Sequence, residues 1–234
     1  MTFDSAITNR FISKNTETRI SNLDDGCTAE VARHKVAEWH KTGAFVVANA
    51  GAYDILGLNH LRGLTQARII GAAYKLGDFE NLSAIYDLAS SDEIRLILSL
   101  DTNEAITENK SKKSIGGGSI RPSLDWQTRA TMLSLQAVAG KHDMVDFITR
   151  HGPNSCRDCQ DETCWHSDKT YNVASTGADL TVVKSLSEST RNRYPENTFH
   201  VVDESDGAFF DKVLDSQIST SALIRRVRQD KERE

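Results

Sequence analysis

Two predominantly apolar runs stand out in the first half of the chain, Ala44–Ala50 and Ile94–Leu100. The first run leads into Gly51 and the second into Asp101. Apolar runs of this length without alternation are typical of strands that are buried on both faces of a parallel sheet. The pattern therefore predicts two buried, parallel strands.

Helical periodicity separates these two runs. Apolar residues recur at steps of three and four from Leu61 to Tyr74, which predicts an amphipathic helix that begins close to Asn59. Further elements are expected, in chain order, as a helix over Glu30–Lys41, a helix over Glu80–Ala89, a mobile loop over Lys110–Ser119, a helix over Leu124–Val138, strands over Met144–Thr149, Leu180–Val183 and Thr198–Val202, an apolar segment Ala208–Leu214 and a helix from Ser219 to Arg228. The repeated order of strand, turn and helix predicts an α/β fold with a doubly wound parallel sheet of about five strands.

The same order suggests a simple domain organisation. Residues 1–40 are expected to form an N-terminal extension and helix, and residues 41–234 the main domain. Within the main domain, residues 151–170 have no apolar period and contain three of the four cysteines. We therefore expect a cysteine-rich insertion there.

Composition and charge exclude several classes of protein. Hydrophobic residues make up 38% of the chain, and the formal net charge is -5. A negative net charge argues against a protein that coats nucleic acid. No apolar run is long enough to cross a bilayer, and the first residues lack the pattern of a secretory signal. We expect a cytoplasmic protein without nucleic-acid or membrane partners, and the sequence leaves open whether it is a homodimer.

The segment from Gly51 to His60 carries the clearest chemistry, because it joins a buried strand to an amphipathic helix. A glycine at the strand end lets a phosphate approach the backbone, and the helix N-terminus offers unpaired N–H groups to an anion. His60, in the first turn of this helix, can donate a hydrogen bond to a phosphate oxygen. The alternative is a histidine that only caps the helix or lies on the surface.

This segment, Gly51-x-Tyr53-Asp54-x-x-Gly57-x-Asn59-His60, resembles the Gly-x-Phe-Asp-x-x-His-x-Gly-His signature of the cytidylyltransferase-like nucleotidyltransferase superfamily. Within it the chain is similar to the sugar-phosphate nucleotidyltransferases, in particular the adenylyltransferase domain that makes ADP-heptose. The resemblance implies a Rossmann-like fold for the predicted sheet.

Three later segments are similar to motifs of the same family. Arg121-Pro122 followed by Arg129 resembles its Arg-Pro-x₆-Arg stretch, and Asp179–Lys184 resembles its Asp-x-x-Val-Lys strand end with one residue inserted. Ile218–Arg226 is similar to its Ile-Ser-Thr-Ser-x-x-Ile-x-Arg motif. Hydroxyls and arginines at a helix N-terminus also suit phosphate binding on physical grounds. The motifs occur in the family's order.

The resemblance implies transfer of a nucleotidyl group from ATP or CTP to a phosphorylated small molecule, most simply a sugar phosphate, with release of pyrophosphate. Mg²⁺ is expected with the nucleotide. The resemblance implies His60, Lys184 and Arg225 for catalysis, and we add Asn59 as the candidate replacement for a donor that the family has and this chain lacks. Those that it implies for nucleotide binding are Ala50, Gly51, Tyr53, Asp54, Gly57, His60, Asp101, Arg129, Ser219, Thr220, Ser221 and Arg225.

Besides Tyr53 in place of the phenylalanine, the chain departs from the signature at two positions. Gly57 stands where the family has its first histidine, and Asn59 replaces the glycine before the second. Loss of one preorganised donor typically lowers the rate by about 10²–10³-fold. We expect that the Asn59 amide, or a group of the substrate, occupies the space of the missing imidazole. A catalytically silent nucleotide-binding or regulatory module of the same fold is the alternative.

A second candidate site is formed by Cys156, Cys159, Cys164 and His166. Three thiolates and an imidazole in a short polar loop suit a structural, tetrahedral Zn²⁺ ion. His151 or Cys27 can replace His166 as the fourth ligand, and free thiols in a surface loop remain the alternative. The cluster also raises a zinc-dependent nucleic-acid-binding protein as a rival, against which the acidic net charge counts.

Overall fold

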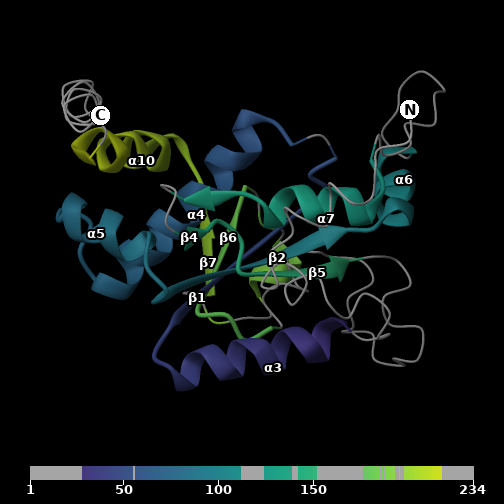
Figure 1. Cartoon of the computed structure of the whole chain (residues 1–234), viewed down its shortest axis with the longest axis horizontal. Helices are drawn as coiled ribbons and strands as arrows, with labels where there is room; N and C mark the ends of the chain where they lie inside the picture. Colours follow the sequence, from purple (N-terminus) through teal and green to yellow (C-terminus); the bar gives the residue numbers. More distant parts are fainter. Residues whose placement is uncertain are drawn as a thin grey trace, which may run out of the picture.

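A parallel sheet with helices on both faces forms the body of the computed structural model (Figure 1). The structure describes residues 28–54, 56–111, 124–138, 142–151, 176–184, 186, 188–192, 195 and 198–217. No helix in these ranges has both the length and the apolar character needed to cross a bilayer.

In the described part of the chain, five strands form one sheet, and every neighbouring pair is parallel. The strands are β1 (Phe45–Gly51), β2 (Ile94–Asp101), β5 (Phe147–His151), β6 (Leu180–Val183) and β7 (Phe199–Val201). Their order across the sheet is β5-β2-β1-β6-β7. The predicted α/β class and parallel sheet are confirmed, and the order is compatible with a Rossmann-like fold.

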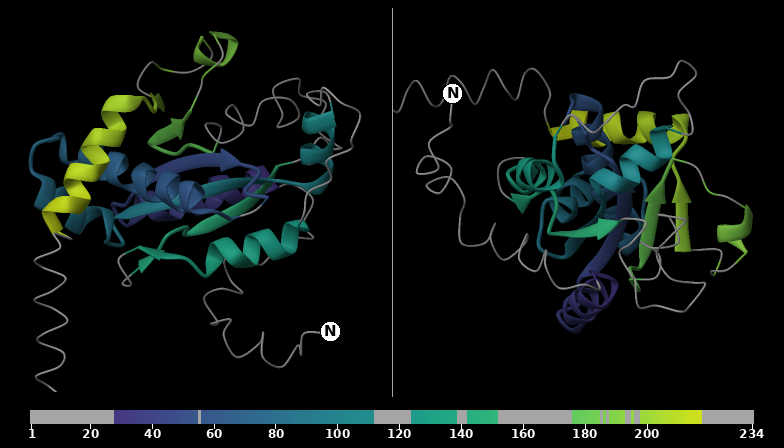
Figure 2. Two further views of the ribbon diagram at one scale, coloured as in Figure 1. Left: turned by 90° about the horizontal axis from the view of Figure 1, so that it is seen from above. Right: turned by 90° about the vertical axis from the view of Figure 1, so that its right-hand side faces the viewer.

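Helices cover the sheet on both sides, so the fold has three layers (Figure 2). The helices are α3 (Thr28–Lys41), α4 (Leu58–Leu76), α5 (Leu82–Ala89), α6 (Asn103–Ser111), α7 (Trp126–Ser134), α9 (Glu188–Arg191) and α10 (Glu204–Gln217). α4, α7 and α10 pack on one face, and α3 packs on the other. Val47 of β1 faces α4, whereas its neighbours Val46 and Ala48 face α3. This two-sided burial explains why β1 has a continuous apolar sequence.

Several elements differ from their predicted bounds. The helix expected over Leu124–Val138 ends at Ser134, and β3 (Ala137–Val138) then pairs antiparallel with β4 (His142–Asp143). The strand expected from Met144 begins only at Phe147, because the Asp146 side chain and N–H bind to β2. Both shifts come from contacts between distant segments, which local periodicity does not contain.

α6 is an element that the apolar pattern does not predict. Ala105 and Ile106 are its only apolar residues, and both are buried. Two adjacent apolar positions give no helical period. Lys110 and Ser111 therefore belong to a helix, and the rest of the loop expected over Lys110–Ser119 lies outside the described residues.

α4 lies unusually close to the central strand. A Cβ atom added at Gly71 would come within 2.2 Å of Val47 Cγ2, a distance that side chains cannot reach without moving. Glycine at this position therefore lets the helix backbone approach β1 directly. This contact sets the depth at which α4 packs on the sheet.

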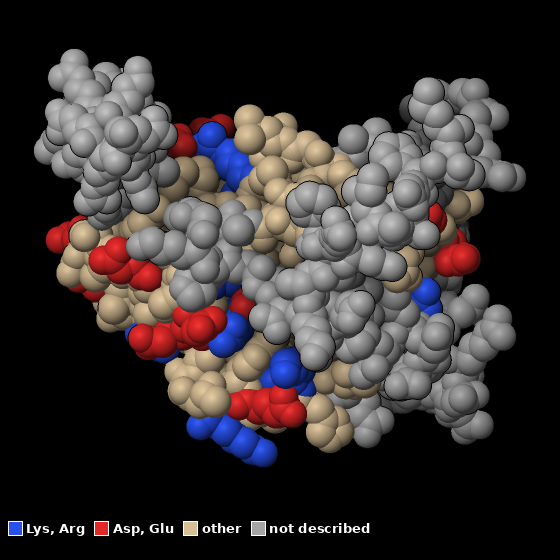
Figure 3. Space-filling model, in the orientation of Figure 1, with Lys and Arg blue, Asp and Glu red and all other residues tan. Residues whose placement is uncertain are grey.

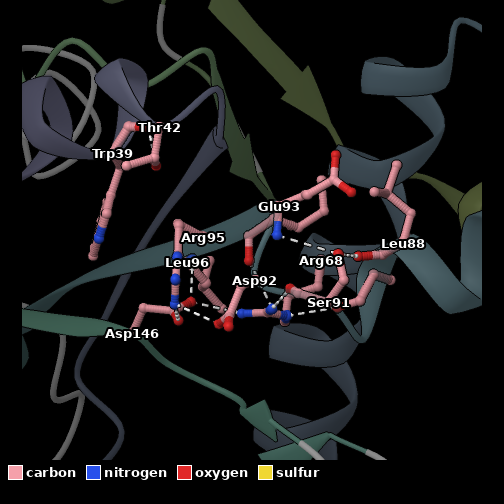
Figure 4. A network of polar contacts seen from close by, with 12 residues as sticks. Trp39, Thr42, Arg68, Leu88, Ser91, Asp92, Glu93, Arg95, Leu96 and Asp146 are labelled. Carbon is pink, nitrogen blue, oxygen red and sulfur yellow. Dashed lines mark hydrogen bonds and ion pairs between the residues drawn. The ribbon is translucent and has the colours of Figure 1, made fainter.

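A buried ion pair joins Arg68 of α4 to Asp146, the residue that precedes β5 (Figure 4). Arg68 Nη1 donates to Asp146 Oδ2 over 2.7 Å, and the two side chains are 1% and 9% exposed. The Arg68 guanidinium also donates to three backbone carbonyl oxygens, those of Ala89, Ser91 and Ile94. Arg68 thus ties α4, the end of α5 and the start of β2 together.

Asp146 completes the network from the other side. Its carboxylate accepts hydrogen bonds from the Leu96 N–H over 2.7 Å and from Arg95 Nη1 over 2.9 Å. A buried charge is tolerated only when its partners satisfy it in this way. The network therefore fixes the amino-terminal edge of β2 and β5 relative to α4.

We predict that Asp146→Ala lowers the free energy of unfolding by about 3–5 kcal/mol, because it leaves the Arg68 charge buried without its carboxylate. The matched control is Asp211→Ala, which removes the exposed pair with Arg62, where the side chains are 47% and 54% exposed. Exposed pairs contribute only about 0–1 kcal/mol. Urea unfolding of both variants checks this, and equal losses would contradict a dominant role for the buried pair.

Candidate functional site

The carboxyl-terminal edge of the sheet brings together residues that are distant in the sequence. β1 ends at Gly51, β2 ends at Asp101, and Lys184 directly follows β6. Because these strands are parallel, their carboxyl ends lie at the same edge. Asp101 is buried at 3% exposure, whereas Lys184 is exposed.

The order of the strands changes direction between β1 and β6. The chain leaves β1 through α4 and α5, forms β2 and β5 on one side, and then returns to place β6 on the other side of β1. In open α/β sheets, ligands bind outside the carboxyl ends of the strands at such a switch point. Two parts of the chain lie at this switch point: the turn that follows Gly51, and Lys184.

The turn from Gly51 to Gly57 is held by a buried tyrosine. Tyr53 has a left-handed φ of 45°, a conformation that costs a non-glycine residue on the order of 1–3 kcal/mol. Its ring lies over Gly51, where an added Cβ would approach Tyr53 Cε2 to 2.5 Å. Burial, with a smaller contribution from Asp101, raises the pKa of the Tyr53 hydroxyl, so this group remains a hydrogen-bond donor. The packing of the Tyr53 ring therefore requires glycine at position 51, and the same absence of a side chain leaves room for a ligand to approach the backbone.

His60 lies in the first turn of α4, and one of its two ring nitrogens accepts a hydrogen bond. The Gly57 N–H donates to His60 Nδ1 over 3.2 Å. An imidazole nitrogen that accepts a hydrogen bond carries no proton, so the neutral His60 ring carries its proton on Nε2. Among the described residues, no hydrogen bond to Nε2 is found. The histidine thus caps the helix and still offers one N–H donor.

The helix N-terminus beside His60 has the features of an anion site. The first N–H groups of a helix lack intrahelical acceptors, and this end carries the positive end of the helix dipole. No acidic side chain lies in the first turn of α4, so no carboxylate of that turn competes for it. Leu58 and Asn59 in this turn are exposed.

Arg129 and Asp54 hold the turn after β1 through hydrogen bonds. Arg129 is 1% exposed and donates to the Ala52 carbonyl oxygen, to the Leu124 carbonyl oxygen over 3.1 Å and to Asn103 Oδ1 over 2.8 Å. Asp54 Oδ1 accepts from the Leu124 N–H over 3.3 Å. Burial lowers the pKa of the Arg129 guanidinium, and nearby carboxylates, Asp54 first among them, act in the opposite direction. Both residues organise the turn.

The structure leaves the space beside Gly57 open. Gly57 has an extended backbone with φ of -108°, and, apart from its two chain neighbours, no described residue has an atom within 4 Å of a Cβ added there. The expectation that the Asn59 amide, or a group of the substrate, supplies the missing donor concerns the ligand-bound site and stays a prediction.

The other predicted site residues divide into two groups. Ala50 is half-buried on β1, next to the turn. Ser219, Thr220, Ser221 and Arg225 lie outside the described residues, as do Cys27, Cys156, Cys159, Cys164 and His166. The described part of the chain contains no group of three or more His, Cys, Asp or Glu residues that could hold a metal ion.

Asn49 and Asn103 are site residues that sequence reasoning missed. Asn49 Nδ2 donates to the Val182 carbonyl oxygen over 2.8 Å, which joins β1 to β6 at the switch point. A polar side chain inside a continuous apolar strand was the available signal. Asn103 had no such signal, because its partner Arg129 lies 26 residues away in the chain.

Comparison with protein-family models finds no match to this chain, and comparison with curated proteins finds none either. The chemistry of the site therefore rests on its own geometry and on the sequence motifs.

We predict opposite outcomes for alanine at the two glycines of the turn. Gly57→Ala should change the free energy of unfolding by no more than about 0.5 kcal/mol, because its Cβ enters open space on an extended backbone. Gly51→Ala should cost about 1–3 kcal/mol, because its Cβ must displace the buried Tyr53 ring. Urea unfolding measures both, and a Gly51→Ala protein as stable as Gly57→Ala would mean that the ring moves freely.

Proposed function

We propose that this chain is a nucleotidyltransferase that transfers a nucleotidyl group from ATP or CTP to a phosphorylated small molecule, such as a sugar phosphate. One observation carries the proposal. The N-terminus of α4, with the His60 Nε2–H donor, lies at the switch point between β1 and β6, and Lys184 follows β6 at the same edge. This arrangement combines backbone donors, an imidazole donor and a cation, which suits a triphosphate.

The reaction needs little covalent chemistry from the protein. A phosphate oxygen of the acceptor attacks the α-phosphorus in line, a new P–O bond forms, and the bond to pyrophosphate breaks with its electron pair on the leaving oxygen. The protein contributes by positioning and by stabilising charge. In this proposal, His60 Nε2–H donates to an oxygen of the triphosphate, and Lys184 offsets the negative charge that grows on pyrophosphate.

The ions in the proposal follow from the chemistry of their ligands. Mg²⁺ usually binds triphosphate oxygens with only one or two protein carboxylates, so it needs no full protein cage. It would neutralise part of the phosphate charge when bound. Arg225, the hydroxyls of Ser219, Thr220 and Ser221, and a structural Zn²⁺ on the cysteine cluster belong to the proposal through their sequence motifs alone.

A catalytically silent nucleotide-binding module is the second candidate. The open space at Gly57 favours it, because no described side chain supplies the second imidazole of the signature. Such a module would still bind the triphosphate at α4, since the helix N-terminus and the His60 donor are in place. The two candidates thus share a binding site and differ in turnover.

Nucleic acid is a less suitable partner for the described surface. Lys and Arg side chains are interspersed with Asp and Glu on the face drawn in Figure 3. Nucleic-acid-binding proteins instead gather their basic residues in a patch or stripe. The distribution on this face favours a small anionic ligand at a local site.

We predict that the protein releases pyrophosphate from ATP or CTP when a sugar phosphate is present, and that His60→Ala lowers kcat by about 10²–10³-fold. His34→Ala is the matched control, because His34 is an exposed histidine on α3, on the opposite face of the sheet. Its turnover should equal that of the wild type. A coupled pyrophosphate assay over a panel of sugar phosphates measures both variants.

Two results would contradict the transferase proposal. Wild-type protein that binds a nucleotide but releases no pyrophosphate with any acceptor would favour the silent module. Turnover that survives His60→Ala unchanged would remove the imidazole from the reaction.

A further inference from the structure

A chain of hydrogen bonds connects the turn after β1 to the neighbouring strand β6. The Tyr53 hydroxyl donates to Asn49 Oδ1 over 2.8 Å, and Asn49 Nδ2 donates to the Val182 carbonyl oxygen over 2.8 Å. Tyr53 is buried at 9% exposure. Without Asn49 its hydroxyl would lose this hydrogen bond, and water could not replace it. Asn49 therefore connects the turn to both strands that border the switch point.

The Tyr53 ring contacts two features of the site. It covers Gly51, where only the absence of a Cβ allows its approach. Its centroid also lies 5.1 Å from the centroid of the His60 ring, at an interplanar angle of 50°. A tilted aromatic contact at this separation is favourable and limits the orientations of both rings.

His60 is thus held from two directions. The Gly57 N–H donates to Nδ1 and selects the tautomer, and the Tyr53 ring limits rotation of the imidazole. The left-handed backbone at Tyr53, with φ of 45°, is unfavourable for an aromatic residue and persists only where surrounding contacts enforce it. The hydrogen bond to Asn49 and the packing over Gly51 are the contacts that do so.

We propose that Asn49 and Tyr53 are positioning residues, which act through the Tyr53 ring to hold His60 with its Nε2–H fixed as a hydrogen-bond donor at the switch point. The effect of this positioning role on turnover rests on the proposed function, whereas its effect on the His60 ring does not. Neither residue needs to touch the nucleotide. The sequence motif placed Tyr53 at the nucleotide, and this inference gives it a different role.

The test uses Tyr53→Phe, which removes the hydroxyl and keeps the ring. Tyr74→Phe is the matched control, because the Tyr74 hydroxyl also bonds to a side chain, His200 Nδ1, over 3.0 Å. Gly51→Ala is a second variant that displaces the Tyr53 ring and keeps its hydroxyl. If Tyr53→Phe does not fold, Gly51→Ala decides the question alone.

The primary measurement is the pair of imidazole ¹⁵N chemical shifts of His60 in nucleotide-free protein, assigned by their loss in His60→Gln. The wild type and Tyr74→Phe should show one neutral tautomer, protonated on Nε2. Tyr53→Phe and Gly51→Ala should show averaging between the two tautomers, because a His60 ring that is no longer restrained by Tyr53 rotates away from the Gly57 N–H that selects the tautomer. In a working transferase, the same two variants should lower kcat by about 10-fold to 100-fold with a smaller change in KM, because they misplace a donor without removing it.

The outcomes separate this inference from the proposed function. A single Nε2–H tautomer in both Tyr53→Phe and Gly51→Ala would overturn the positioning role, whatever the turnover. Tautomer averaging in a protein whose wild type releases no pyrophosphate would support the positioning role and contradict the transferase.

Discussion

The close packing of α4 on β1 is the constraint on which the rest of the structure depends. Gly71 brings the helix backbone against Val47, and Arg68 ties the same helix to the start of β2 through a buried ion pair with Asp146. The helix axis is therefore fixed by contacts in its middle and towards the amino-terminal edge of the sheet. Its N-terminus is left to project at the carboxyl-terminal edge, where no acidic residue lies in its first turn.

A second set of contacts fixes the turn that precedes this helix. Asn49 holds Tyr53 and the neighbouring strand β6, and Arg129 holds the Ala52 carbonyl oxygen together with Asn103 of α6. These polar groups satisfy one another, and Tyr53 and Arg129 among them are buried, which makes the turn rigid. A donor such as His60 Nε2–H can act on a developing charge only if it is already in place. The structural and chemical features of this edge therefore depend on the same few side chains.

The sequence predicts the strands and helices of this fold where burial produces a regular pattern. β1 and β2 were predictable because both of their faces are buried. α4 was predictable from apolar residues at steps of three and four, although the helix is buried on all sides from Gln66 to Ala73 rather than on one apolar face. α6 was not, because Ala105 and Ile106 are its only apolar residues. The late start of β5 was not, because it depends on Asp146 and partners about 50 to 78 residues away.

In the candidate site too, local contacts were predictable from the sequence and contacts between distant residues were not. The contact between Gly57 and His60 spans three residues and agrees with an ordinary helix cap, so the sequence could suggest it. The Ala52 contact of Arg129 spans 77 residues and requires the fold. The role expected of Asn59 stays a prediction, because motif spacing does not encode the position of a side chain in an exposed first turn.

The central claim is that a nucleoside triphosphate binds at the N-terminus of α4, next to the end of β6. Titration of ¹⁵N-labelled protein with ATP and with CTP, followed by backbone amide chemical shifts, tests it most directly. A site at this edge predicts that the largest shift changes fall on Leu58–Leu61 and on Lys184, with small changes along α3. Changes confined to α3 or to the Arg68–Asp146 edge, or no change with either nucleotide, would contradict it.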